Sequence, residues 1–152
     1  MAIYQIRYIR EKVSDALPAI ITTPKSALDY FLAQCFTPDE LWREKLYVLF
    51  VDSGRRACGH MLVSVGGLDD TSFDSRLIIK AALDSAAHAV VLAHNHPSGN
   101  PVPSQRDIQI TARIKNQLAA MGLSFMDHII IGENTFYSFA EENVHLTTQC
   151  ST

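Results

Sequence analysis

Apolar side chains recur along the chain in two patterns, one typical of strands and one typical of helices. Runs rich in apolar and β-branched residues predict five strands, at 46–51, 57–65, 88–93, 124–131 and 135–139. Apolar residues three and four positions apart predict three helices, at 24–36, 75–87 and 104–121. This mixed order of strands and helices predicts an α/β sandwich with a mixed sheet.

Each predicted helix has one apolar side that should face the core. The inward positions are Ala27, Leu28, Phe31, Leu32 and Cys35 in the first helix, Leu77, Ile78, Ala81, Ala82 and Ala86 in the second, and Ile110, Ile114, Leu118 and Met121 in the third. The turn at 52–54 favours an antiparallel hairpin between the first two strands. The next strand–helix–strand order indicates a crossover unit with a site at the carboxyl edge of its last strand.

The length of 152 residues is that of one domain, predicted to span 1–152 with a core at about 22–142. Residues 3–9 have the composition of an edge strand or an extended arm, and residues 141–152 that of a frayed tail. The net charge of −3 gives no electrostatic footprint for nucleic acid, so strong DNA binding is not expected.

Three cysteines, Cys35, Cys58 and Cys150, are far apart and odd in number, which implies no disulfide framework and fits a reducing, cytoplasmic location. The N-terminal residues lack the apolar stretch of a signal peptide, and no run is long enough for a membrane span. We therefore expect a soluble cytoplasmic protein.

The stretch that departs from ordinary globular sequence is AHNHPSGNPVPSQRD, at 93–107. In an extended segment the side chains at i and i+2 point the same way, so His94 and His96 can present two imidazoles to one point. A Pro/Gly/Asn-rich turn then leads to a helix that starts at Ser104. Asp107 lies three residues before Ile110, in the first turn and on the inward side of that helix.

Two imidazoles and one carboxylate are three N/O ligands, the number that a catalytic zinc keeps when a fourth position is left for water. The simpler interpretation is that Ser104 and Asp107 form a capping box and only close the helix N-terminus. A His-x-His pair in a loop is also often incidental. The other histidines, His60, His88, His128 and His145, have no motif partner and are interpreted as structural or surface residues.

The motif in 93–107 resembles the signature of RadC-like proteins, which belong to the JAB/MPN+ (JAMM) metalloprotease superfamily. The segments REKLYVLFVDSGRR, SVGGLDD, DHIIIG and YSFAEE resemble the family's core strands and turns, and the resemblance covers roughly residues 22–142. It implies a deaminase-like, three-layer α/β/α sandwich and a zinc ion bound by His94, His96 and Asp107. Met61 stands where many relatives carry a second glutamate, so no role is carried over to that position.

The resemblance also implies that Ser104 helps to stabilise an oxyanion and to position water, and that Glu44 is the general base. These parts suit hydrolysis of an amide bond, peptide or isopeptide, with an unknown peptide or protein as substrate. Oligomers are possible. Two alternatives stay open: an interaction module that uses the fold as a scaffold, and a metal-dependent nuclease suggested by the tripeptide His94-Asn95-His96, although no ββα-metal hairpin or basic surface is visible.

Overall fold

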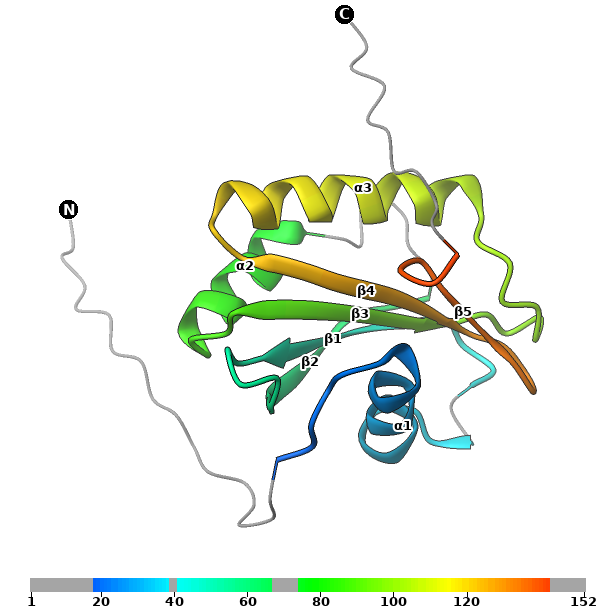
Figure 1. Ribbon diagram of the computed structural model, residues 1–152. Helices are drawn as coiled ribbons and strands as arrows, with labels where there is room; N and C mark the ends of the chain where they lie inside the picture. The colour runs from blue at the N-terminus through cyan, green and yellow to red at the C-terminus, as the bar shows by residue number, and fades with distance from the viewer. Residues whose placement is uncertain (1–17, 39–40, 67–73, 143–152) are drawn as a thin grey trace, which may run out of the picture.

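The computed structural model describes residues 18–38, 41–66 and 74–142, and within them three helices pack on a five-stranded sheet (Figure 1). The helices are α1 (Pro24–Gln34), α2 (Ser75–Asp84) and α3 (Gln105–Ala120). The strands are β1 (Lys45–Val51), β2 (Ala57–Val65), β3 (Ala89–Asn95), β4 (Ser124–Ile131) and β5 (Phe136–Ser138). The arm predicted at 3–9 and most of the tail predicted at 141–152 lie outside the described residues, so a single domain over 1–152 stays a prediction.

The sheet is mixed, with the strand order β2-β1-β3-β4-β5. β1 runs antiparallel to both β2 and β3, β3 runs parallel to β4, and β4 runs antiparallel to β5. The hairpin predicted between the first two strands is therefore confirmed. The predicted crossover unit corresponds to β2–α2–β3. Its two strands are parallel to each other, but they are not neighbours in the sheet because β1 lies between them. The unit β3–α3–β4 joins adjacent parallel strands, and its loop begins at the carboxyl end of β3.

The two faces of the sheet carry separate apolar cores, which makes the structure a three-layer α/β/α sandwich, as the family resemblance implied. α1 covers one face, and its buried Phe31 packs with residues of β1, β3 and β4 such as Leu49 and Ile129. α2 and α3 cover the other face, where Ile78 and Ile114 pack with β1 and β3 (Figure 1). All seven residues of β3 are buried, because this strand has neighbours on both edges and helices over both faces.

The second helix ends earlier than the apolar pattern predicted, at Asp84 instead of 87. Ala86 has a φ of 52°, in the left-handed region, and the N–H of Ala87 bonds to the carbonyl of Ala82 at 2.9 Å. This hydrogen-bonding pattern closes a helix C-terminus, so the chain leaves the helix before β3 begins. Ala86 is consequently exposed, and the expectation that it faces the core was wrong.

Three large residues expected to face the core are half exposed: Leu32 at 46%, Leu77 at 55% and Met121 at 50%. Leu77 lies about 100° around the helix from the buried Ile78, which is enough to turn it to solvent. Met121 is the C-cap residue of α3 and no longer follows the helical stripe. Apolar spacing located each helix face correctly but predicted a wider face than the one that is buried.

No helix among the described residues combines the length and the hydropathy needed to cross a membrane.

A matched pair of leucine substitutions tests which side of each helix carries the packing energy. Leu118→Ala removes a fully buried side chain from the core under α3, and should lower the free energy of unfolding by about 2–5 kcal/mol. Leu77→Ala removes the same atoms from an exposed position on α2, and should change it by less than about 0.5 kcal/mol. Urea unfolding followed by circular dichroism measures both. Equal losses in the two variants would contradict the packing described here.

Candidate metal centre

The histidine pair lies where β3 ends and the loop to α3 begins. His94 is the next-to-last residue of the strand and its side chain is fully buried, whereas His96 follows the strand and is 16% exposed at its side chain. Asn95 stands between them, and strand alternation turns its side chain away from both imidazoles. The two imidazoles therefore leave the sheet in a common direction, toward the N-terminus of α3.

α3 begins with the capping box that the simpler interpretation predicted. Ser104 is the N-cap: its Oγ accepts from the N–H of Asp107 at 3.2 Å, and its own N–H donates to Asp107 Oδ2 at 2.7 Å. The Ser104 hydroxyl also donates to Asp107 Oδ2 at 2.6 Å. These bonds do not take Asp107 away from the histidines. They hold its carboxylate in the first turn, on the buried side of the helix and at the positive end of the helix dipole.

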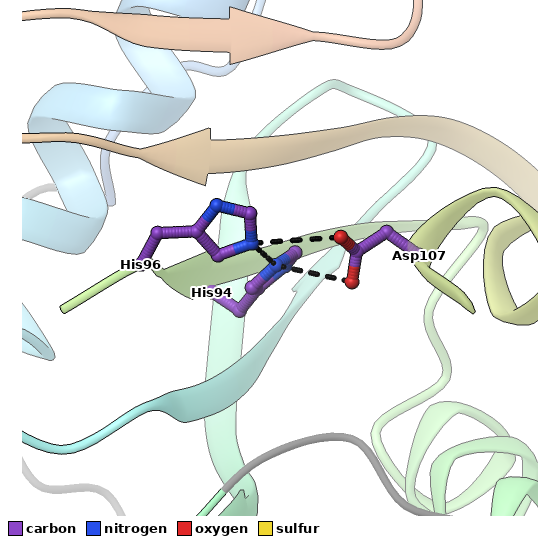
Figure 2. A group of neighbouring side chains, drawn as sticks. All are labelled: His94, His96 and Asp107. Atoms are coloured by element: carbon purple, nitrogen blue, oxygen red, sulfur yellow. Dashed lines mark hydrogen bonds and ion pairs between the residues drawn. The ribbon is translucent and has the colours of Figure 1, made fainter. Parts of the chain in front are cut away.

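The structure brings His94, His96 and Asp107 together (Figure 2). The two Nε2 atoms are 2.9 Å apart, His94 Nε2 is 3.3 Å from Asp107 Oδ1, and His96 Nε2 is 3.5 Å from Asp107 Oδ2. One ligand atom from each residue lies within 4.8 Å of the others, a spacing at which they could hold one metal ion. This is the only such group of three or more His, Cys, Asp or Glu residues in the described part of the chain.

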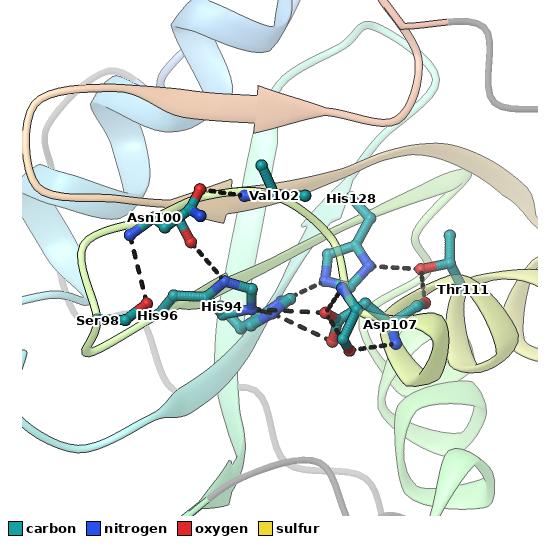
Figure 3. A network of polar contacts seen from close by, with 9 residues as sticks. His94, His96, Ser98, Asn100, Val102, Asp107, Thr111 and His128 are labelled. Atoms are coloured by element: carbon teal, nitrogen blue, oxygen red, sulfur yellow. Dashed lines mark hydrogen bonds and ion pairs between the residues drawn. The ribbon is translucent and has the colours of Figure 1, made fainter.

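A chain of buried hydrogen bonds fixes the tautomer of His94 (Figure 3). The Thr111 hydroxyl donates to the carbonyl of Asp107 at 2.6 Å, so its oxygen must accept from His128 Nδ1, also at 2.6 Å. His128 Nε2 is then unprotonated and accepts from Nδ1 of His94 at 2.7 Å. Since a neutral imidazole carries one N–H, Nε2 of His94 presents a lone pair to the site.

His96 is held in the same tautomer by the loop. Its Nδ1 lies 2.8 Å from the carbonyl oxygen of Asn100, which can only accept, so Nδ1 carries the proton and Nε2 presents a lone pair (Figure 3). Two lone pairs that face each other at 2.9 Å beside a carboxylate repel one another. A cation among them, either a metal ion or a proton on His96, removes this repulsion. The donor set therefore fits a divalent metal.

The pKa values of the three residues show how a proton and a metal ion compete for this site. Burial lowers the pKa of His94 to about 4, so this imidazole stays neutral at physiological pH. The hydrogen bond to Asp107 raises the pKa of His96, with smaller contributions that include the Asn100 carbonyl and the charge of Glu44. Burial alone would raise the pKa of Asp107, but the hydrogen bond from His96, the nearby His94 and the bonds from Ser104 hold it well below its usual range. Asp107 is thus ionised whenever a metal is to bind.

The loop that carries His96 is supported by the turn after β4. The N–H of His96 donates to the carbonyl of Ile131 at 3.0 Å, and the N–H of Glu133 donates to the carbonyl of Gly99 at 3.0 Å. Between these bonds the backbones approach so closely that a Cβ on Gly132 would lie 2.5 Å from the carbonyl oxygen of Gly99. Only glycine fits at position 132 without displacing the loop.

Glu44 lies one residue before β1, in the segment that crosses the end of β3. Its carbonyl accepts from the N–H of Gly66 at 2.8 Å, and its carboxylate is close enough to raise the pKa of His96. Lys45, the next residue, is hydrogen-bonded through its N–H to the Asn95 side chain at 2.9 Å. The structure therefore brings the segment of Glu44 to the histidine end of the sheet, as its proposed part in the site requires.

Sequence reasoning missed two residues of this site, His128 and Thr111. His128 was interpreted as structural or surface because it has no partner in the motif, yet it is fully buried, bonded to His94 and stacked on Phe139 at 5.2 Å between ring centroids. The available signal was a histidine inside the apolar run at 124–131, on the strand expected after α3. Which strand lies beside β3 is a tertiary fact, so the pairing could not be read from spacing.

Comparison with known proteins shows what the sequence of this chain is similar to. A model of the RadC-like JAB domain family matches residues 21–144. A Pelobacter propionicus protein named UPF0758 protein is 40% identical over 126 residues, which make up 81% of this chain and 52% of that protein. A Haemophilus ducreyi protein of the same name is 36% identical over 139 residues, 91% of this chain and 60% of that protein.

A third relative, the UPF0758 protein of Carboxydothermus hydrogenoformans, is 37% identical over 102 residues, 67% of this chain and 45% of that protein. The chain thus spans about half the length of the curated relatives it matches. The range of the family model, 21–144, includes His94, His96 and Asp107.

The tautomer chain predicts the effect of removing the Thr111 hydroxyl. Thr111→Val leaves the Nδ1–H of His128 without an acceptor and frees His94 to change tautomer, so zinc affinity should fall by about 10–100-fold. Thr111→Ser keeps the hydroxyl and should keep the affinity, and Thr22→Val, at an exposed position, is the matched control. Isothermal titration with zinc measures all three. Equal affinity in Thr111→Val and wild type would show that Thr111 does not set the tautomer.

The competition between metal and proton predicts a pH dependence. Because the hydrogen bond to Asp107 raises the pKa of His96, an added divalent metal such as zinc must displace a proton from His96 wherever the pH lies below that pKa. Affinity should then fall about tenfold for each unit of decrease in pH below the His96 pKa, and level off above it. Competition with a chromophoric chelator between about pH 5 and 8 measures the slope. His60→Gln should leave it unchanged, and a flat profile across this range would contradict the assignment.

Proposed function

We propose that this chain, which belongs to the RadC-like JAB domain family, is a zinc-dependent hydrolase that cleaves an amide bond. One observation carries the proposal: His94, His96 and Asp107 direct two imidazole lone pairs and a carboxylate at one point, beside the segment of Glu44. Three acceptors held in this way by a buried hydrogen-bond network have a chemical purpose only if a cation binds among them.

Zinc is the metal that this donor set suits best. Two neutral imidazoles and one carboxylate form a typical set of three protein ligands for a catalytic zinc, with a further position left for water or substrate. Magnesium and calcium prefer oxygen ligands alone, which the two histidines do not offer. The bound zinc would supply Lewis acidity: it lowers the pKa of a water molecule toward 7 and polarises the substrate carbonyl.

The chain's own groups perform the proton transfers. Glu44 accepts a proton from the attacking water while the water oxygen bonds to the carbonyl carbon of the substrate. Glu44 then returns that proton to the amine nitrogen as the C–N bond breaks. Ser104 first serves to hold Asp107, since its hydroxyl donates to Oδ2. For the proposed oxyanion contact the hydroxyl would turn away from Oδ2, which keeps its bond from the Ser104 N–H.

A peptide or isopeptide bond is the proposed substrate, and two observations favour it over a nucleic acid. The net charge of −3 provides no general attraction to phosphates. β3 also lies in the middle of a five-stranded sheet, whereas the nuclease suggested by His94-Asn95-His96 needs a two-stranded hairpin. A reducing, cytoplasmic location belongs to the same proposal, which the lack of a disulfide at Cys35 and Cys58 in the described part of the chain supports.

The decisive experiment combines metal analysis with a hydrolysis screen on peptide, isopeptide and DNA substrates. Wild type should hold about one zinc per chain, and His96→Ala should lose it. Glu44→Gln keeps the shape of the side chain but removes the proton acceptor, so activity should fall by about 10²–10⁴-fold while zinc stays bound.

Glu142→Gln is the matched control, because Glu142 is exposed after β5 and should leave both zinc and activity unchanged. A folded wild type without stoichiometric metal after zinc supplementation would refute the proposal. Zinc binding without hydrolysis of any of the three substrate classes would favour the interaction module, and cleavage of DNA alone would favour the nuclease.

A further inference from the structure

Asn95, between the two histidines, makes three hydrogen bonds to a different segment of the chain. Its Oδ1 accepts from the N–H of Lys45 at 2.9 Å, and its Nδ2 donates to the carbonyls of Leu41 and Arg43, each at 3.0 Å. The Asn95 residue is 2% exposed. All three bonds go to backbone groups about fifty residues earlier in the sequence, just before and at the start of β1.

The side-chain chemistry of asparagine matches these partners one for one. A primary amide offers two N–H donors and a carbonyl acceptor, and the segment presents two carbonyls and one N–H. Aspartate could accept from Lys45 but would place a negative charge against two carbonyl oxygens. Each buried group left without a partner costs about 1–3 kcal/mol, so the arrangement is specific for asparagine.

Two of the backbone groups that Asn95 binds flank Glu44 in the sequence: the carbonyl of Arg43 and the N–H of Lys45. The N–H of Gly66 binds the carbonyl of Glu44 itself, at 2.8 Å. The backbone on either side of Glu44 is thus fixed to β3, the strand that also presents the histidines. We propose that Asn95 is a positioning residue, which sets the distance between the general base Glu44 and the metal ligands His94 and His96.

This inference rests on the proposed function, because Glu44 needs a fixed position only if it acts as the base. The geometry gives the reason for using the residue between the ligands. A shift of β3 moves His94, Asn95 and His96 together, and Asn95 then carries the segment of Glu44 with it. One strand therefore fixes the distance between the base and the metal. A displacement of the base by about 1 Å would lower the catalytic rate by as much as 10²-fold.

The first test needs neither metal nor substrate. Trp42 is the only tryptophan of the chain, lies in the segment that Asn95 binds, and is 71% exposed. Time-resolved fluorescence anisotropy of Trp42 therefore reports the local motion of this segment. Asn95→Asp should increase the amplitude of the fast decay, and Asn116→Asp, at an exposed position on α3, should not. If circular dichroism shows that Asn95→Asp does not fold, Asn95→Ala replaces it. The smaller alanine side chain leaves room for water to bind the backbone groups that Asn95 no longer reaches.

The second test asks whether Asn95 acts through Glu44. Cobalt(II) replaces zinc in such sites and has a visible spectrum that depends on pH through the groups around the metal. Glu44→Gln should shift the midpoint of this spectral titration, and Asn95→Asp should shift it in the same direction. The double variant should match Glu44→Gln alone, because Asn95 has nothing left to position. A purely structural role of Asn95 would lower stability without this coupling.

The outcomes separate the inference from the proposed function. Unchanged Trp42 anisotropy in Asn95→Asp overturns the inference whatever the metal does. So does a cobalt titration of Asn95→Asp that matches wild type, or a shift that adds in full to that of Glu44→Gln. A wild-type protein that takes up neither zinc nor cobalt overturns the proposed function, and with it the part that concerns Glu44, while Trp42 still decides whether Asn95 holds the segment.

Discussion

The structure depends on one electrostatic constraint: three acceptor groups, two imidazole nitrogens and a carboxylate, are held within a few ångströms of one another with their lone pairs converging. Such groups repel unless a cation lies among them, so the surrounding protein must prevent them from turning away. Thr111 and His128 hold His94, the carbonyl of Asn100 holds His96, and the Ser104 cap holds Asp107. The direction of each supporting bond is set, directly or through the next bond, by a backbone group: the Asp107 carbonyl, the Asn100 carbonyl or the Asp107 N–H.

The fold supplies the rigidity that this constraint demands. β3 is buried along its whole length between an antiparallel and a parallel neighbour, so its end cannot move without disturbing both cores. The parallel neighbour β4 places His128 on the same side as His94, and α3 returns over that side with Asp107 in its first turn and Thr111 one turn later. The crossover β3–α3–β4 thus joins two neighbouring strands of the sheet and also assembles the candidate metal ligands with their supports.

Much of this could be predicted from the sequence, and the remainder was unpredictable for a physical reason. Local periodicity located the strands, the helices, the hairpin and the capping box of Ser104, because each depends on residues within a few positions. It overestimated the helix faces at Leu32, Leu77 and Met121, since neighbours in the fold decide how wide a face is covered. It also missed His128, because its bond to His94 joins residues on two strands whose order in the sheet is set by packing and not by local sequence.

The tripeptide His94-Asn95-His96 shows how strand geometry gives one short motif two tasks. Alternation places the imidazoles on one side and the amide on the other, so the residue between two ligands cannot itself be a ligand. Facing the opposite way, Asn95 meets the backbone around Glu44 and satisfies two carbonyls and one N–H there. An apolar residue at position 95 would leave the two imidazoles unchanged but would leave three part-buried backbone groups, before and at the start of β1, without this partner. The requirement for a polar residue at this position therefore comes from the backbone around Glu44, and not from the two imidazoles.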